Sequence, residues 1–289
     1  SKAGEGKKPW VHVVPCPDTY RGPHRERRKA GEMYASYVKR AVDEAGGSVA
    51  AFFVESGMSV AGVILPPPDY LKHCYRHIRR AGGVCIADEV QTGFGRFGDY
   101  FWGFEQQGVV PDVVTMGKPF GNGMPLAAVV TTRAVSDAFC NGMEYFNTFG
   151  GNPVCAAAGL AVLEIIESEG LQAHAKAVGK YLRQRFTELS AKHGIIGQIR
   201  GSGLFCGVEF VRNRTTKEPA TAEVSFLCSQ LKNQFRILTT VDGAHDNVLV
   251  IKPPMVFGKP ETDVLISAID DVLTNMKEED LAKVGHTPT

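Results

Sequence analysis

The 289-residue chain lacks several features that mark specialised classes of protein. Its net charge is only +1, so no global electrostatic field favours nucleic acid or an anionic membrane surface. No apolar run approaches the length that spans a membrane. The seven cysteines show no CxxC spacing and an odd count, which favours free thiols over a disulfide framework. We therefore expect a globular protein with no nucleic-acid and no membrane partner.

Two kinds of ligand site are also missing from the sequence. His73 and His77 have a helical spacing that suits a metal, but no further ligand cluster lies nearby, so a plain surface helix is favoured and no metal is expected. Gly93, Gly95 and Gly98 do not lead straight from a strand into a helix, so the dinucleotide fingerprint is absent. Aromatic packing over this glycine-rich turn and direct ligand contact both stay open.

Apolar segments alternate with helical patterns in the first part of the chain, which predicts an α/β sheet with at least partly parallel strands. The strand at Val49–Val54 shows no polar alternation, so both of its faces are expected to be covered. Asp69 is the predicted N-cap of the second helix. The predicted strands are Trp10–Val14, Val49–Val54, Val84–Ala87, Val113–Met116 and Leu126–Val130, and the predicted helices are Glu32–Ala45, Tyr70–Arg80, Val154–Glu167 and Leu171–Lys192.

The pattern changes after the helix at Leu171–Lys192, which indicates a second domain. We expect a large domain at 1–170, a connecting helix at 171–195 and a small α+β domain at 196–289. The small domain's predicted strands are within Ile199–Val211 and at Ile237–Thr239 and Val248–Ile251, and its predicted helices are around Val224–Lys232 and Thr262–Met276.

Two of the apolar strands deliver chemically active side chains at their carboxyl ends. Val84–Ala87 is followed by Asp88, and Val113–Met116 is followed by a glycine and Lys118. Open α/β sheets bind ligands at this edge. A lysine that forms a Schiff base, with an aspartate that keeps a pyridine nitrogen protonated, is the arrangement that pyridoxal phosphate requires. An ordinary ion pair at the sheet edge is an equally weighted alternative.

A third element of such a site is a phosphate-binding turn. Asn147–Pro153 comes directly before a strongly helical run, and the hydroxyl of Thr148 with free backbone N–H groups can hold a phosphate there. A simple N-cap formed by Thr148 or Asn152 explains the same residues equally well.

Four motifs in this order and spacing make the cofactor interpretation much stronger: IADEVQTGFGRFG, PDVVTMGK, GNGMPLAAV and EYFNTFGGNP. From about Trp10 to Met276 the chain resembles the class III aminotransferase family. The resemblance implies the fold-type I architecture of enzymes that use pyridoxal 5'-phosphate, with a large, mostly parallel sheet domain and a small C-terminal α+β domain.

The resemblance also implies roles for individual residues. Lys118 and Asp88 are the catalytic pair, Lys118 as the Schiff-base lysine and Asp88 facing the pyridine nitrogen. Val90 packs on the cofactor ring, Gln91 reaches the ring hydroxyl, and Glu55 supports the site from its strand end. Thr148 binds the cofactor phosphate of the neighbouring subunit, which implies a homodimer or a tetramer.

Two departures indicate which reaction is catalysed. Many amino-acid transaminases of this family bind the substrate carboxylate with an arginine before the PP pair and hold that arginine against a glutamate. The matching positions are Val250 and Val60 here, and neither can bind a carboxylate. The segments VESGMSVAG, TMGKPFGNG, EPATAE and IKPPM resemble the phospho-lyase branch of the family.

That branch implies elimination of phosphate and ammonia from a phosphorylated amine, either phosphoethanolamine or 5-phosphohydroxy-L-lysine. Lys118 would act as the general base, and Lys252 or Arg96 would assist the leaving phosphate or serve only as structural charges. The absence of a carboxylate arginine favours phosphoethanolamine slightly. The alternatives are a transaminase acting on an amine or amino acid, and an inactive chain with a dimerisation or regulatory role.

The family's Gly/Ser phosphate loop and its ring-stacking aromatic residue belong to a long N-terminal region that this chain does not match. We therefore expect a fragment or an incomplete gene product. Relatives are expected in mitochondria or the cytoplasm, and any targeting segment would lie in that unmatched region.

Overall fold

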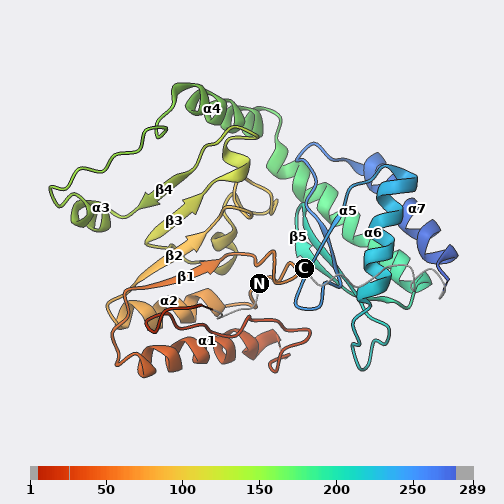
Figure 1. The fold of residues 1–289 in the computed structure, drawn as a ribbon, viewed down its shortest axis with the longest axis horizontal. Coiled ribbons are helices and arrows are strands. Elements are labelled where there is room, and N and C mark those ends of the chain that lie inside the picture. Colours follow the sequence, from red (N-terminus) through yellow and green to blue (C-terminus); the bar gives the residue numbers. More distant parts are fainter. Residues whose placement is uncertain (1–5, 26, 278–289) are drawn as a thin grey trace. The chain divides into compact units, whose positions relative to one another are not determined.

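The computed structural model describes residues 6–25 and 27–277, and the chain divides into two compact units (Figure 1). The first unit comprises Ser1–Ser56, Pro66–Phe94 and Trp102–Ile165, and the second comprises Gly57–Leu65, Gly95–Phe101 and Ile166–Thr289. The units are therefore interleaved along the chain. The predicted domain boundaries at 170 and 195 stay a prediction.

The first unit contains a mixed four-stranded sheet with the order β1-β2-β3-β4, which Figure 1 shows from orange to green. β1, β2 and β3 are parallel, because β1 and β2 are joined by a helical crossover, and β4 is antiparallel to β3. The predicted α/β sheet with partly parallel strands is confirmed. The strands are β1 (Ala51–Glu55), β2 (Val84–Asp88), β3 (Val113–Met116) and β4 (Ala128–Thr131).

Two helices support this sheet. α2 (Tyr70–Arg80) packs against β1 and β2, and α1 (Arg27–Glu44) packs against α2. α2 has its predicted bounds, because its apolar residues recur at helical spacing and form one buried face. Asp69 is the N-cap residue of α2, as predicted, but it adopts the left-handed conformation (φ 63°) and its side chain makes no cap hydrogen bond.

Two strand predictions require correction. β1 is not covered on both faces, since Phe53 is 59% exposed, and among the described strands it pairs with β2 alone. Trp10–Val14 forms no strand, because these exposed residues have no partner strand with which to pair among the described residues.

The remaining helices of the first unit are α3 (Arg133–Phe139), α4 (Pro153–Ser168) and two short 3₁₀ helices, η1 (Gly103–Gln107) and η2 (Lys118–Phe120). α4 begins at Pro153, as the sequence predicts for the first helical turn. Asn152 Oδ1 accepts hydrogen bonds from the N–H groups of Val154 (3.0 Å) and Cys155 (3.3 Å). Asn152 is therefore the residue that caps α4.

The second unit is built on an antiparallel sheet with the order β5-β6-β8-β7. Every residue of β6 is buried, because β6 lies inside the sheet and its apolar side chains join the core. The strand predicted at Ile237–Thr239 is observed as β7, which begins at the next residue, Thr240. The strands are β5 (Ile196–Ser202), β6 (Phe205–Phe210), β7 (Thr240–Asp242) and β8 (Val248–Ile251), and the helices are α5 (Leu171–Lys192), α6 (Thr221–Phe235) and α7 (Lys259–Asn275).

Helices α5, α6 and α7 supply one apolar stripe each to the core of this second unit. Leu182, Phe186, Leu227, Leu231 and Ile269 are almost fully buried against the sheet. Among the described residues, no helix combines the length and the apolar character that crossing a membrane requires.

Candidate active site

The first unit places the predicted acid and lysine at the same edge of its sheet. Glu55 pairs in register with Asp88, and Asp88 pairs with Thr115 on β3. Lys118 follows two residues after the last residue of β3 and opens η2. Because β1, β2 and β3 run parallel, their carboxyl ends meet at one edge, and the three candidate side chains follow from it.

Asp88 is half-buried and oriented by its own turn. Its Oδ1 accepts a hydrogen bond from the backbone N–H of Val90 (2.9 Å). No described residue donates a hydrogen bond to the other oxygen, Oδ2. One carboxylate oxygen therefore fixes the side chain, and the other is available to a ligand.

Lys118 has a strained backbone, with φ 38°, in a region that non-glycine residues seldom adopt. Its side chain is exposed, and within the described chain its amine has neither an ion pair nor a hydrogen bond. Asp88 and Lys118 thus do not form the simple ion pair that the sequence left open. Such strain gathers at active sites.

Val90 lies beside the lysine turn. Its Cγ2 would stand 3.9 Å from a Cβ placed on Gly117, the residue before Lys118. Gln91 follows it and is half-buried. The structure thus brings Val90 to the Lys118 turn, as contact of both residues with one ligand would require.

Thr115 adds a polar group that no sequence pattern singled out. Its buried Oγ1 has no hydrogen-bond partner in the described structure, and Thr115 stands next to Asp88 on the neighbouring strand. An unsatisfied buried hydroxyl calls for an explanation, such as a ligand atom. With the open oxygen of Asp88 and the open amine of Lys118, it fits a ring-shaped cofactor that carries polar substituents.

Glu89 is a second residue that the sequence interpretation missed. It is fully buried, and its carboxylate accepts hydrogen bonds from Thr92 Oγ1 (2.7 Å), Gly103 N (2.8 Å) and Phe104 N (2.9 Å). Burial raises the pKa of Glu89, and these hydrogen bonds oppose the rise. Glu89 thereby ties the turn after Asp88 to the start of η1. Its position in the sequence, directly after a buried strand, was the only available signal.

Thr148 lies apart from this edge in the part of the chain that is described. It is exposed in a turn before α4, and no hydrogen bond joins it to Asp88 or Lys118. Asn147 shapes that turn, because its Oδ1 accepts from Phe149 N (3.1 Å) and Gly150 N (2.9 Å). The hydroxyl of Thr148 caps no helix, so the alternative that Thr148 serves as an N-cap does not apply.

The two cations considered for the leaving phosphate lie in the second unit. Arg96 Nη1 donates to the backbone carbonyls of Leu204 (3.1 Å) and Pro253 (2.8 Å), and burial lowers its pKa. Arg96 therefore has a structural role, in which it connects the backbone at Leu204 to the backbone at Pro253. Lys252 Nζ donates to Ser59 Oγ (2.6 Å).

The two valines that replace the carboxylate clamp have different surroundings. Val250 is buried in an apolar cluster with Val63, Phe97 and Phe205. Val60 is largely exposed, and its carbonyl accepts from Gly243 N (3.0 Å). Neither offers a charged group to a substrate.

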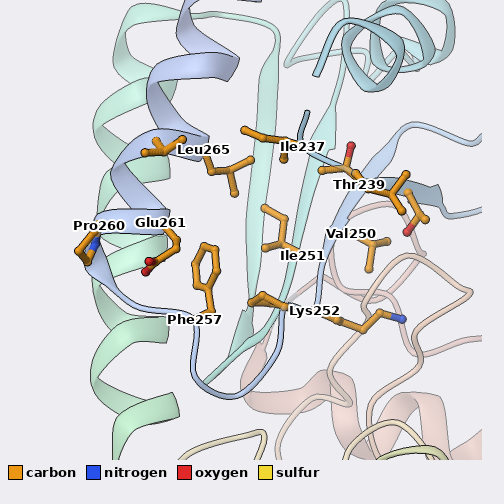
Figure 2. A pocket seen from close by; sticks show the side chains of 13 residues that line it. Ile237, Thr239, Val250, Ile251, Lys252, Phe257, Pro260, Glu261 and Leu265 are labelled. Atoms are coloured by element: carbon orange, nitrogen blue, oxygen red, sulfur yellow. The ribbon is translucent and has the colours of Figure 1, made fainter. Parts of the chain in front are cut away.

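A cavity of about 500 Å³ in the second unit is separate from the predicted cofactor residues, none of which lines it (Figure 2). It lies between β7, the end of β8 and the start of α7. Figure 2 shows the amine of Lys252 pointing away from Phe257 and Glu261. Glu261 accepts from Gly258 N (2.9 Å) and so caps α7. The cavity is mainly apolar, and neither Asp88 nor Lys118 lines it.

His73 and His77 lie on α2. His73 Nδ1 is 3.2 Å from Arg76 Nη2, and burial together with neighbouring cations lowers the pKa of His77. Across the described part of the chain, no group of three or more histidine, cysteine or acidic side chains is arranged to hold a metal.

The model of the family described as "Aminotransferase class-III" matches residues 2–273. This chain belongs to the class III aminotransferase family. Family membership and the solved neighbours imply pyridoxal 5'-phosphate as the cofactor and fold-type I as the architecture, which confirms both expectations.

Named relatives of this class III chain include both reaction types. A Drosophila melanogaster protein named alanine–glyoxylate aminotransferase 2-like is 43% identical over 287 residues, covering 96% of this chain and 58% of the relative. A Caenorhabditis elegans ethanolamine-phosphate phospho-lyase homolog is 41% identical over 282 residues, covering 92% and 60%. The chain thus spans about three-fifths of the length of these relatives.

Among solved structures, an Arthrobacter phospholyase in complex with phosphoethanolamine superimposes with a TM-score of 0.87 and 36% identity. The match covers 92% of this chain and 64% of that one. A Bacillus anthracis aminotransferase superimposes with a TM-score of 0.84 and 32% identity, covering 91% and 61%. The class III family is shown by these matches, and both reaction types occur within it.

Proposed function

We propose that this chain carries the pyridoxal-phosphate site of a phospho-lyase, which eliminates phosphate and ammonia from a phosphorylated amine. The observation that carries the proposal is the edge of the first sheet. There, the free oxygen of Asp88, the free amine of Lys118 and the unsatisfied hydroxyl of Thr115 follow from adjacent strands.

Each residue would have a distinct role toward the cofactor. Asp88 Oδ2 would hold the proton on the ring nitrogen by a charge-assisted hydrogen bond. Val90 would pack on the ring, Gln91 would reach the ring hydroxyl, and Glu55 would support Asp88 from the neighbouring strand. Thr148 would bind the phosphate of the cofactor in a neighbouring subunit.

Lys118 would hold the aldehyde carbon of the cofactor through Nζ until the substrate amine displaces it. The bound cofactor supplies an electron sink for the electron pair left on the amine-bearing carbon. Lys118 then takes the proton from that carbon as general base. The bond between the adjacent carbon and the phosphate oxygen would then break, phosphate would leave with the two electrons of that bond, and the pair from the C–H bond would form a carbon–carbon double bond. Hydrolysis by one water would release an aldehyde and ammonia.

Three observations favour phosphate elimination over amino transfer. Val250 is buried among apolar side chains and Val60 carries no charge, so the carboxylate clamp and its counter-ion are both absent. A substrate without a carboxylate near the reacting carbon, such as phosphoethanolamine, needs no such clamp. The likeness to the Arthrobacter phospholyase with phosphoethanolamine supports the same choice. Arg96 already binds two carbonyls of the second unit, so a role for it in binding the leaving phosphate is disfavoured.

A class III transaminase is the second candidate. The same lysine and aspartate serve both reactions, and relatives at 43% and 45% identity are named as alanine–glyoxylate aminotransferases. An inactive chain with a dimerisation or regulatory role is the third. It is disfavoured by Asp88 and Lys118, which stand together without neutralising each other.

We also propose a homodimer in mitochondria or the cytoplasm, the former because two relatives carry "mitochondrial" in their names. The segment before and within α4 exposes large apolar side chains that a second copy would cover. They are Phe139, Met143, Tyr145, Phe146, Phe149, Val154, Leu160, Leu163 and Ile165. Sedimentation equilibrium with and without a charged substitution at Phe146 tests the dimer.

The reaction itself is tested with the full-length protein loaded with pyridoxal phosphate. Phosphate release is measured with phosphoethanolamine and with 5-phosphohydroxy-L-lysine, and amino transfer is measured with pyruvate and glyoxylate. We expect phosphate release that Lys118→Ala abolishes and Asp88→Asn reduces strongly. Amino transfer without phosphate release would support the transaminase instead. A wild-type protein that shows neither reaction and no cofactor absorbance would support the inactive chain.

A further inference from the structure

We propose that Phe94 is a positioning residue, which holds the Lys118 turn against the Asp88 turn by stacking on Phe120. The inference rests on the proposed function, because it assigns a reason for the spacing of the two reactive groups. Phe94 lies within the turn that follows Asp88, the last residue of β2, and Phe120 is the last residue of η2, which Lys118 opens.

The contact between the two rings is close and nearly parallel. The ring centroids of Phe94 and Phe120 are 5.2 Å apart and the interplanar angle is 27°. Phe94 is only 2% exposed and has a left-handed backbone (φ 62°), which is uncommon for an aromatic residue. The backbone thus adopts an unfavourable conformation in which this side chain faces Phe120.

Phe94 is held on its other side as well. Trp102 meets it edge to face, with centroids 5.3 Å apart and an interplanar angle of 68°. Gly93 permits this approach, because a Cβ there would stand 2.7 Å from Trp102 Cζ3. The next two residues, Gly103 and Phe104, donate their N–H groups to the carboxylate of Glu89, beside Asp88.

Phe120 is confined by α4. A Cβ on Gly159 would stand 3.2 Å from Phe120 Cε2 and 2.4 Å from Leu126 Cδ2, so the glycine lets both side chains pack closely against α4. The Lys118 turn is therefore fixed between α4 and Phe94.

These contacts form a continuous chain within the first unit. It runs from Asp88 through Glu89 to the start of η1, then through Trp102 and Phe94 to Phe120 and Lys118. Aromatic packing of this kind keeps its geometry because interiors are close-packed and rearrange little. A small displacement of a reactive group reduces rates strongly, by up to about 100-fold for about 1 Å. Removing the ring of Phe94 eliminates its stacking contact with Phe120, which connects the Asp88 turn to the Lys118 turn.

The test uses full-length protein, stripped of cofactor and then supplied with pyridoxal phosphate. The readouts are the rate at which Lys118 becomes covalently trapped on borohydride addition, the pH midpoint of the cofactor absorbance band, and Tm. Phe94→Leu should slow trapping by about tenfold or more and shift the pH midpoint, since the amine is presented less accurately. Phe120→Leu should have the same effects, and the double variant should add little to either single one.

Phe97→Leu is the matched control. Phe97 is equally buried, and its ring centroid is also 5.2 Å from that of its partner, Phe205, but the pair belongs to the second unit. It should lower Tm without changing the trapping rate or the pH midpoint. Equal trapping rates in Phe94→Leu, Phe97→Leu and wild type would overturn the inference. If Phe94→Leu fails to fold, Phe120→Leu decides, because Phe120 is only half-buried.

The failure of this inference and the failure of the proposed function are separable. A wild-type protein in which Lys118 is never trapped contradicts the cofactor site itself. A wild-type protein that is trapped at Lys118, with Phe94→Leu and Phe120→Leu trapped at the same rate, contradicts only the positioning role.

Discussion

Each of the two units contains a fully buried glutamate, and the two carboxylates are stabilised by different kinds of partner. Glu209 in the second unit meets Arg200, whose Nη1 lies 2.5 Å from Glu209 Oε2. Glu89 in the first unit forms no ion pair with any described cation, and it accepts hydrogen bonds from the hydroxyl of Thr92 and from the backbone N–H groups of Gly103 and Phe104. One carboxylate is satisfied by a charge, and the other by dipoles.

The two glutamates differ in their partners because Glu89, unlike Glu209, lies next to Asp88, whose second carboxylate oxygen is open. Arg200 also donates through Nε to Gly62 O (2.8 Å), so one guanidinium secures both the sheet and a loop. A cation beside Glu89 would stand next to Asp88 and would compete for its open oxygen. Uncharged donors satisfy Glu89 without doing so. The first unit therefore keeps a buried carboxylate whose pKa is raised directly beside Asp88, the proposed partner of the cofactor ring.

Breaking the ion pair of the second unit should have the largest effect on stability. Arg200→Ala leaves Glu209 buried without a countercharge, and we expect a loss of about 3–5 kcal/mol in the free energy of unfolding. Urea titration followed by circular dichroism measures it. The double variant Arg200→Met/Glu209→Leu is the control and should recover much of the loss, because it leaves no unpaired charge. A loss below about 1 kcal/mol for Arg200→Ala would contradict the assigned importance of the pair.

Glu89→Gln should have an intermediate effect. The amide keeps one acceptor oxygen but places an NH₂ donor against N–H donors of η1, so a loss of about 1–3 kcal/mol is expected. Thr92→Val, which removes a single donor, should cost less. Identical urea midpoints for wild type and Glu89→Gln would show that the carboxylate does not hold the turn.

The pH dependence of stability tests the burial of Glu89. The pKa of Glu89 is raised above its ordinary value of 4.5, chiefly by burial, so the folded state binds this proton more tightly than the unfolded state. Its contribution to stability is complete below the unfolded pKa and is lost as pH rises through the folded pKa. Glu89→Gln should lack this loss, so the difference in stability between variant and wild type should narrow as pH rises. A difference that widens with pH would refute the assigned direction.

The smallest effect is expected for an ion pair at the surface of the second unit. Asp270 accepts from Lys192 Nζ (2.7 Å) and lies 2.6 Å from His193 Nε2, and these hydrogen bonds lower its pKa. Its contribution is present above the unfolded pKa and is lost as pH falls through the folded one. Asp270→Asn should cost less than about 1 kcal/mol near neutral pH and nothing in acid. Thermal melts at both pH values test this, and an equal cost at both would contradict it.

Much of the local structure could be predicted from periodicity. The bounds of β3, β8, α2 and α5 agree with the prediction, because each shows an uninterrupted apolar pattern that ends at polar, glycine or proline residues. The pairing of Glu55 with Asp88 could be anticipated only as a shared sheet edge, since register depends on the partner strand. The exposure of Phe53 was missed because an apolar strand predicts burial without saying which face is covered.

The sequence alone determined the family and the cofactor class, and it placed Asp88 and Lys118, the two proposed reactive residues, at the ends of strands that local pattern specifies. Only the tertiary structure decided that Glu89 holds η1, that Phe94 stacks on Phe120, and that Arg96 binds two carbonyls. The reason is physical. Strand and helix patterns depend on neighbours a few residues away, whereas side-chain partners distant in the chain are selected by packing and hydrogen-bond satisfaction in three dimensions.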